Sequence, residues 1–331
     1  KLPTKASAVA VVEFTAQVPA YGDQEDIRYL PIIKSGTQVT NGNNTYEVLY
    51  DIDFNSAVNS SGNSDRTKIP IFTNGKLTGY TITKTGIIVA GTTKTFTQVI
   101  ATSRAFQQIT LPENNVLSVD SIIHKTGTNY TTIPTLNEFN TSSNKWYEVP
   151  SLAEDNIFIE DPNSPRVDGI AKGVYEKIDQ RYIVEYTPNG FCQVTFGAQT
   201  DSSIDILDDF MDAGSFNLKS FLRNGSLGLA PIANTTMYIR YRIGGGVDSN
   251  AGVGTINEIA QLLADISGPD TTIASNVRAS ISVTNTTPAL GGSDEPSIEE
   301  LRQYIAYNFS AQSRAVTLND YKSLIETMPS T

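Results

Sequence analysis

The sequence has few side chains suited to catalysis, with one cysteine and one histidine among its 331 residues. A single cysteine, Cys192, excludes an intrachain disulfide. Its alternating neighbours predict a small packed side chain in a strand. Any Ser-His-Asp triad or zinc site would depend wholly on His124, which lies in a strand-like run without a nucleophile motif. We therefore predict no enzymatic activity, no catalytic residue, no cofactor and no metal.

Basic clusters and long apolar runs are also missing. The chain has 24 Lys and Arg against 35 Asp and Glu, which gives a net charge of −11. Without a basic patch it lacks the footprint of phosphate contacts, so we expect no nucleic-acid partner. No apolar stretch approaches the roughly 20 residues of a membrane span, so we expect no membrane partner. The first residues include no Met and no signal-peptide core, and we expect a fragment of a longer protein.

Short alternations of apolar and polar residues, rich in Thr, Ser and Asn, fill most of the chain. They predict an α+β fold that is mainly β, with antiparallel sandwich or barrel-like domains and a helical C-terminal part. The clearest hairpin joins residues 181–186 to residues 191–196 through Pro188-Asn-Gly190. Other strands are expected near residues 8–14, 79–83, 86–90 and 237–243.

Changes of pattern divide the chain into three predicted parts. Residues 1–100 form an N-terminal β domain, and residues 101–250 form a central β domain with a helical insertion near 201–230. Residues 251–331 form a helix-rich C-terminal part, for which packing back on the first domain is one arrangement. In the insertion, aspartates occupy one side of a short helical pattern, and apolar residues including Phe210 and Met211 occupy the other.

Capping boxes indicate where the C-terminal helices start. Thr255 with Glu258 predicts a helix over about 256–266, ended by Gly268-Pro269. Ser297 with Glu300 predicts the next helix, because apolar residues follow at steps of three and four. A last helical pattern runs from Leu318 to Met328.

Two patterns, one rich in glycine and one in aspartate, suggest ligands, and each departs from its template. The segment from Gly244 to Gly254 precedes an expected helix, but position 257 is Asn where a dinucleotide loop needs Gly. The aspartates between 201 and 212 alternate with apolar residues at helical spacing, unlike a calcium loop. Carboxylate pairs for glycoside hydrolysis converge only in space, so the sequence leaves that possibility open.

The C-terminal stretch carries a pattern of separated residues. It comprises Asn285, Pro288-Ala, Gly291-Gly, Asp294-Glu295, Ser297, Arg302, Arg314-Ala-Val-Thr317 and Asp320-Tyr321. This pattern resembles the baseplate J-like family of contractile phage tails. Leu30 to Thr37 resembles that family's Pro-x-Gly-Thr turn. Phe196-Gly197, with Tyr241 to Gly246 and Asn250, resembles its Phe-Gly and Gly-rich segment. The acidic composition and the insertion after Gly197 are closest to the wedge proteins of T-even phages.

The resemblance implies a structural role in the virion. Such proteins form a ring around the tail hub, assemble in the host cytoplasm, and rearrange when the sheath contracts. Other baseplate wedge proteins, the sheath initiator and further copies, as a homodimer or ring oligomer, are the implied partners. The alternative is a carbohydrate-binding or carbohydrate-cleaving β-rich domain of a tail or fibre.

Two hypotheses concern individual residues. The insertion offers a subunit contact through Phe210, Met211, Phe216 and Phe221, or it caps its own β domain. The glycines Gly244, Gly245, Gly246, Gly252 and Gly254 are a candidate hinge. For the polar signature residues Asp294, Glu295, Arg302, Arg314, Asp320 and Tyr321, we favour structural anchoring of loops and helices over chemistry.

Overall fold

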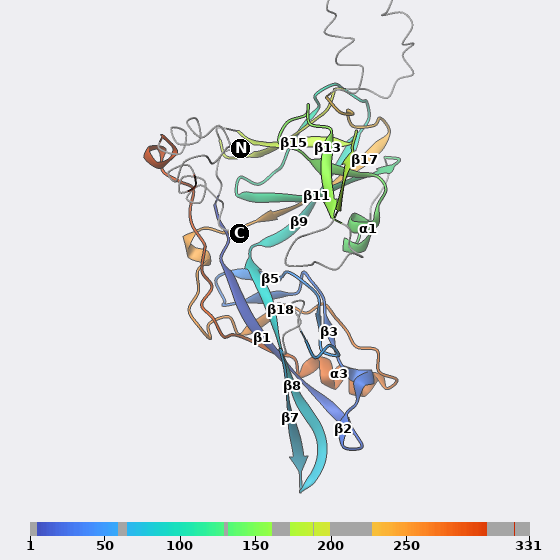
Figure 1. Cartoon of the computed structure of the whole chain (residues 1–331), viewed down its shortest axis with the longest axis vertical. Coiled ribbons are helices and arrows are strands. Elements are labelled where there is room, and N and C mark those ends of the chain that lie inside the picture. The colour runs from blue at the N-terminus through green and yellow to red at the C-terminus, as the bar shows by residue number, and fades with distance from the viewer. Residues whose placement is uncertain are drawn as a thin grey trace, which may run out of the picture. The chain divides into compact units, whose positions relative to one another are not determined.

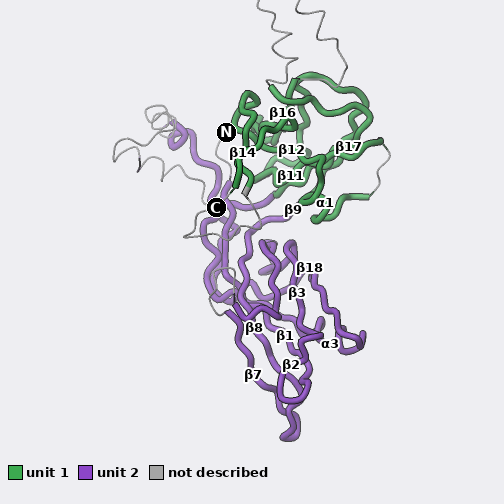
Figure 2. The backbone as a smooth tube through the Cα atoms, turned by 45° about the vertical axis from the view of Figure 1, so that its right-hand side comes forward, with its two compact units in different colours: residues 1–2, 94–242 green, residues 3–93, 243–331 purple. Residues whose placement is uncertain are grey.

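The computed structural model describes residues 5–58, 65–128, 132–160, 173–187, 189–198, 227–302 and 321 (Figure 1). Its contacts divide the chain into two compact units (Figure 2). Unit 1 comprises residues 1–2 and 94–242, and unit 2 comprises residues 3–93 and 243–331. Both are built mainly from curled antiparallel sheets, which confirms the predicted fold class. The C-terminal strands thus belong to the same unit as the N-terminal ones.

Two long strands form the centre of unit 2. Strand β1 (Val9–Tyr21) runs antiparallel to β8 (Lys76–Ala90), with register pairs from Val9↔Val89 to Pro19↔Gly79. Alternate side chains of β1, such as Val12 and Phe14, are fully buried, as expected for a strand with one face on a core. The sheet order is β18 (Glu258–Gln261), β4 (Gln38–Thr40), β5 (Thr45–Val48), β8, β1 and β2 (Gln24–Glu25), with β20 (Ser282–Asn285) on β1 and β7 (Arg66–Thr73) on β8.

The helix predicted over 256–266 is wrong. Its residues form β18, which pairs with β4, and β19 (Ala264–Asp265), which pairs with β3 (Ile32–Ile33). Strand β3 also pairs with β6 (Ile52–Asp53). Pairing with strands more than 200 residues away in sequence outweighs the local helical pattern.

Helix α3 (Thr271–Ala279) begins where the sequence pattern predicted an end. Asp270 caps it by accepting hydrogen bonds from the N–H groups of Thr272 and Ile273, at 2.8 and 3.3 Å. Gly268 lies against the ring of Tyr29, and a Cβ there would fall 1.9 Å from Tyr29 Cε1. The glycine therefore allows a close approach of the chain to an aromatic ring, which a helix-ending signal does not reveal.

Unit 1 contains a mixed sheet. Its order is β10 (Gln108–Thr110), β16 (Cys192–Phe196), β15 (Arg181–Tyr186), β12 (Lys145–Glu148), β11 (Val116–Thr126), β17 (Thr235–Ile243) and β9 (Thr92–Ile100). The β15–β16 pairing confirms the predicted hairpin. Helix α1 (Leu136–Thr141) has a capping box made by Thr135 and Glu138. Strands β13 (Asn156–Glu160) and β14 (Gly173–Lys177) form a separate two-stranded sheet.

Buried aromatic rings contact one another in the core of unit 1. Trp146 packs edge-to-face on Phe196, with ring centroids 5.1 Å apart, and its Nε1–H donates to His124 Nδ1 at 3.1 Å. Cys192 is fully buried, as the strand pattern predicted, and His124 is also buried. Burial lowers the pKa of His124, because a charged imidazole would lose its hydration.

Candidate functional site

The glycine-rich segment after β17 and the C-terminal signature meet in unit 2. Gly246 N–H donates to Ala6 O at 2.9 Å, and Gly246 O accepts from Ser249 N–H and from Ser249 Oγ. The side chain of Asn250 binds both backbone groups of Gly292, with Gly292 N–H donating to Oδ1 at 2.9 Å and Nδ2 donating to Gly292 O at 2.8 Å. The Asn250 side chain thereby joins the glycine-rich loop to the signature segment at Gly292, 42 residues later in the sequence.

Asn285, the first residue of the signature, plays a similar part. Its side chain is buried, and its Oδ1 accepts from Ile256 N–H at 2.9 Å. Its Nδ2 donates to Gly252 O and to Thr287 O, each at 2.8 Å. Only an amide offers both an acceptor and two donors here, so a carboxylate could not replace it without facing two carbonyl oxygens. Asn285 is therefore an anchoring residue for the segment from Gly252 to Ile256.

The five glycines of the candidate hinge fall into two groups. A Cβ on Gly244, at φ 115°, would lie 2.9 Å from Gly91 Cα, and a Cβ on Gly246, at φ 92°, would lie 2.7 Å from Asp294 Oδ1. Gly252 and Gly254 have no neighbour that would meet a Cβ closer than 3.6 Å. Gly245 shares the positive φ, at 73°. Gly244 and Gly246 are therefore closely packed by their neighbours. A Cβ at Gly252 would make only an ordinary contact, and a Cβ at Gly254 would make none.

The remaining signature residues in the described part of the chain lie at the surface. Asp294 Oδ1 accepts from Val247 N–H at 3.3 Å and lies 3.9 Å from Lys5 Nζ. Arg302 pairs with Glu299 at 2.8 Å, and Glu295 and Tyr321 are exposed. The Ser297–Glu300 capping box is confirmed, because Ser297 N–H donates to Glu300 Oε2 and Glu300 N–H to Ser297 Oγ.

Several predicted site residues lie outside the described residues. They are the candidate contact residues Phe210, Met211, Phe216 and Phe221, and the signature residues Arg314 and Asp320. The structure thus brings together the glycines with Asp294 and Asn285, and leaves the insertion hypothesis as a prediction.

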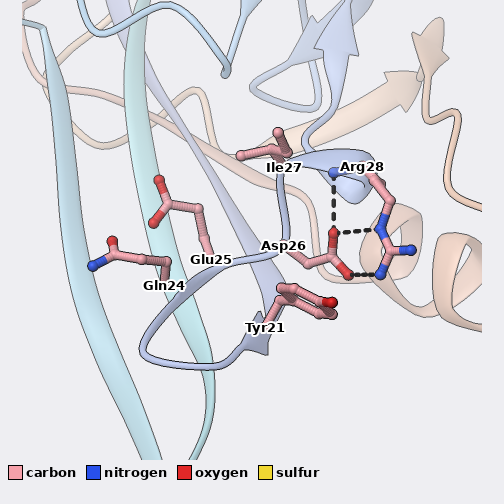
Figure 3. A pocket seen from close by; sticks show the side chains of 6 residues that line it. All are labelled: Tyr21, Gln24, Glu25, Asp26, Ile27 and Arg28. Carbon is pink, nitrogen blue, oxygen red and sulfur yellow. Dashed lines mark hydrogen bonds and ion pairs between the residues drawn. The ribbon is translucent and has the colours of Figure 1, made fainter.

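An open hollow of roughly 490 Å³ lies beside the β1–β2 turn, lined by Tyr21, Gln24, Glu25, Asp26, Ile27 and Arg28 (Figure 3). Its acids are already paired. Asp26 binds Arg28 at 2.7 Å, and Glu25 binds Arg66 at 2.7 Å and Lys68 at 2.5 Å. Burial alone would raise the pKa of Glu25, but the hydrogen bonds from Lys68 and Arg66 outweigh it and lower the pKa to about 2. These ion pairs stabilise the turn, which favours a structural role for the hollow.

Large apolar side chains are exposed on two ribbons of strands. On β7, Ile69 and Phe72 are 61% and 62% exposed. On the β13–β14 pair, Tyr175 is 76% exposed and stacks edge-to-face with Phe158, with centroids 5.5 Å apart. Figure 1 shows β7 and β8 as a hairpin at one end of unit 2. Sequence reasoning missed both ribbons, because an alternating strand pattern does not say which face is covered.

Strand β7 is an edge strand within the described residues, since β8 is its one partner there. Pro70 sits in the middle of it, opposite Tyr80. The ladder continues past this residue, so the proline nitrogen points away from β8, toward the outer edge. The outer edge of β7 therefore lacks a backbone N–H donor near the middle of the strand.

Neither the protein-family models nor the curated proteins contain a match to this chain. Across the described ranges, no three His, Cys, Asp or Glu side chains gather in a way that could hold a metal ion. Within the same ranges, no helix combines the length and apolar character needed to cross a bilayer.

Proposed function

We propose that the chain is a structural subunit of a contractile-tail baseplate wedge in a bacteriophage. The observation that carries this proposal is the pair of exposed apolar ribbons, β7 with Ile69 and Phe72, and β13–β14 with Phe158 and Tyr175. Aromatic and large apolar side chains are enriched at the cores of protein interfaces, and exposed apolar patches mark binding surfaces. The family resemblance of the C-terminal signature supplies the kind of assembly.

In this role the residues of the C-terminal signature hold loops in place and carry out no chemistry. Asn285 and Asn250 fix loops by their amides, and these loops give unit 2 a defined surface. The ribbons contact other wedge proteins, the sheath initiator or further copies of the chain. The wedges form a ring around the hub and rearrange when the sheath contracts.

Reconstitution with the other wedge proteins and the sheath initiator of a T-even phage tests the proposal. We expect a larger complex in sedimentation velocity. The double variants Ile69→Ser with Phe72→Ser, and Phe158→Ser with Tyr175→Ser, should each weaken its formation. Tyr50→Ser is the matched control, because Tyr50 is also 66% exposed but lies outside both ribbons.

An unchanged complex with both double variants would count against the ribbons as contact surfaces. Absence of any complex with the unaltered chain would count against the baseplate role. A glycan array and a screen for released sugars address the carbohydrate alternative, and the proposal expects no signal in either.

A further inference from the structure

The sequence contains four Asn-Gly pairs, at residues 41–42, 74–75, 189–190 and 224–225, and the structure describes the first three. Asparagine followed by glycine is prone to deamidation, because glycine has no side chain to obstruct the attack of its own backbone nitrogen on the asparagine side chain. The sequence alone does not distinguish these pairs. In the folded chain they differ in whether the reacting groups are already held by hydrogen bonds.

In the pair at 41–42, which lies in unit 2, both reacting groups are bound. Gly42 N–H donates to Thr40 Oγ1 at 2.9 Å. The side-chain oxygen Oδ1 of Asn41 accepts from the N–H groups of Asn43 and Asn44, at 3.1 and 2.8 Å. Because the nitrogen is held toward Thr40 and the amide toward the residues that follow, attack would require these hydrogen bonds to break.

The pair at 189–190, in the turn between β15 and β16 of unit 1, is held through its glycine. Gly190 N–H donates to Thr187 O at 2.8 Å. The glycine is also close to another segment, since a Cβ there would lie 3.5 Å from Asn114 O. The attacking nitrogen of this pair is therefore engaged inside its turn.

The pair at 74–75 forms the two-residue turn that joins β7 to β8 in unit 2 (Figure 1). Asn74 and Gly75 have φ 51° and 76°, and Thr73 pairs with Lys76 across the turn. Positive φ at both central residues is the type I′ geometry that Asn-Gly favours. Both residues are exposed, and nothing lies within 4 Å of a Cβ at Gly75. Within the described residues, no hydrogen bond holds Gly75 N–H or the Asn74 side chain.

We propose that Asn74 is a site of spontaneous deamidation in the folded chain, and that the hydrogen bonds of their glycines protect the other two described pairs. Attack on Asn74 requires rotation about its ψ angle, which opens only the turn and the Thr73–Lys76 pair at the end of the ladder. Chain segments at such ends open more readily than pairs inside a sheet. The reaction is independent of the function proposed above.

The reaction needs only water. Gly75 nitrogen loses its proton and bonds to Asn74 Cγ, and the side-chain nitrogen leaves as ammonia. Water then opens the cyclic imide at either carbonyl, which gives aspartate or isoaspartate. Aspartate keeps the turn, since Asp-Gly also suits type I′, whereas isoaspartate adds a methylene to the backbone and lengthens the two-residue turn. Either product places a negative charge at the end of the β7–β8 hairpin.

Peptide mapping by mass spectrometry tests the assignment. One sample of the full chain is incubated folded at mildly alkaline pH, and a second is incubated in guanidinium chloride. The mass gain on replacement of the amide by a carboxylate is followed at the three described pairs. We expect Asn74 to convert several-fold faster than Asn41 and Asn189 in the folded chain. In denaturant the three should convert at comparable rates, because their protecting hydrogen bonds are lost.

Two variants act on the two sides of the comparison. Asn74→Gln should abolish the mass gain in its peptide, because the longer side chain cyclises far more slowly. Thr40→Ala removes the acceptor of Gly42 N–H and should speed the conversion of Asn41 without changing that of Asn74. Equal rates at the three pairs in the folded chain, or an Asn74 that converts only in denaturant, would overturn the proposal. Should Thr40→Ala fail to fold, the ratio of rates in the unaltered chain decides.

Discussion

The two units are both mainly β, and both bury aromatic residues among aliphatic ones. In unit 1 the buried rings of Trp146 and Tyr182 each pack against Phe196. In unit 2 the buried Phe14 lies on the long pair of strands β1 and β8, among Ala, Val and Ile. Ring pairs prefer particular geometries, whereas a long strand pair depends on its register. The comparison suggests that the units hold their shapes by different means and unfold as separate transitions.

The largest expected effect separates the two cores. Phe14 is fully buried in unit 2, and Phe14→Ala should cost about 3–5 kcal/mol of that unit's stability. The one tryptophan, Trp146, lies in unit 1 and reports on that unit by its fluorescence. We expect the Trp146 transition in urea to be unchanged while circular dichroism shows an earlier loss of unit 2.

Phe196→Ala is the counterpart in unit 1, because Phe196 packs directly on Trp146. It should lower the midpoint of the fluorescence transition. A shift of that midpoint by Phe14→Ala of equal size would show that the two units unfold together.

A buried cation in unit 1 should give the next effect. Arg181 is fully buried, with Nε donating to Leu152 O at 2.8 Å and Nη1 to Ile178 O at 2.5 Å. Arg181→Met keeps most of the volume but leaves these carbonyl oxygens without their donors. The expected cost is about 2–3 kcal/mol, measured by the fluorescence of Trp146 in urea. Lys177→Met, at an exposed site, is the matched control and should have little effect.

Lowering the pH should reduce the stability of unit 1 first and that of unit 2 at a lower pH. The pKa of His124 in folded unit 1 lies below the 6.5 of a free histidine, so the unfolded state binds protons first and stability falls as the pH drops below about 6.5. The pKa of Glu25 in folded unit 2 is about 2 against 4.5 unfolded, so its contribution is present above 4.5 and is lost between 4.5 and 2. Urea titrations at pH 7, 5.5 and 3.5 measure both.

His124→Gln is the variant for the first step. An amide oxygen can still accept from Trp146 Nε1–H, and it does not titrate. Stability of unit 1 between pH 7 and 5.5 should then become nearly flat. An unchanged slope would mean that another group titrates there.

The smallest effects should come from the helix caps, one in each unit. Thr135→Ala and Ser297→Ala each remove a side chain that accepts from the backbone N–H three residues later. Each loss is expected to cost about 1 kcal/mol, and only locally. Hydrogen exchange should rise at the start of α1 in the first variant and near residue 300 in the second, without change in the other unit.

Local patterns were enough for part of the fold. The hairpin of β15 and β16, strand β17 and the Ser297 cap all depend on neighbours within a few residues, so alternation and capping predicted them. The sequence pattern predicts two short strands, over 79–83 and 86–90, where the structure has the single strand β8. Gly86 instead accommodates Ile52, whose Cδ1 would lie 2.2 Å from a Cβ at that position. Such a close approach depends on the tertiary fold and leaves no local signal.

The candidate site shows the same limit. The sequence marked Gly244–Gly246 and the signature from Asn285 separately, but only the folded chain joins them through Asn250 and Gly292. The contacts of Glu113 with Lys94 and Tyr241 in unit 1 were not predicted either, because Lys94 and Tyr241 are 147 residues apart in sequence. The sequence also does not distinguish Asn250 from other asparagines, because its hydrogen-bond partners are set by the folded chain.

Pro70 has a consequence for how another chain could pair with the edge of β7. An exposed edge strand with Ile69 and Phe72 would be a template on which a neighbouring chain could add a strand, and such additions continue into fibrils. The missing donor interrupts that template in the middle of β7 while leaving its apolar side chains exposed. The ribbon can therefore offer side chains for recognition and still resist open-ended growth of its sheet.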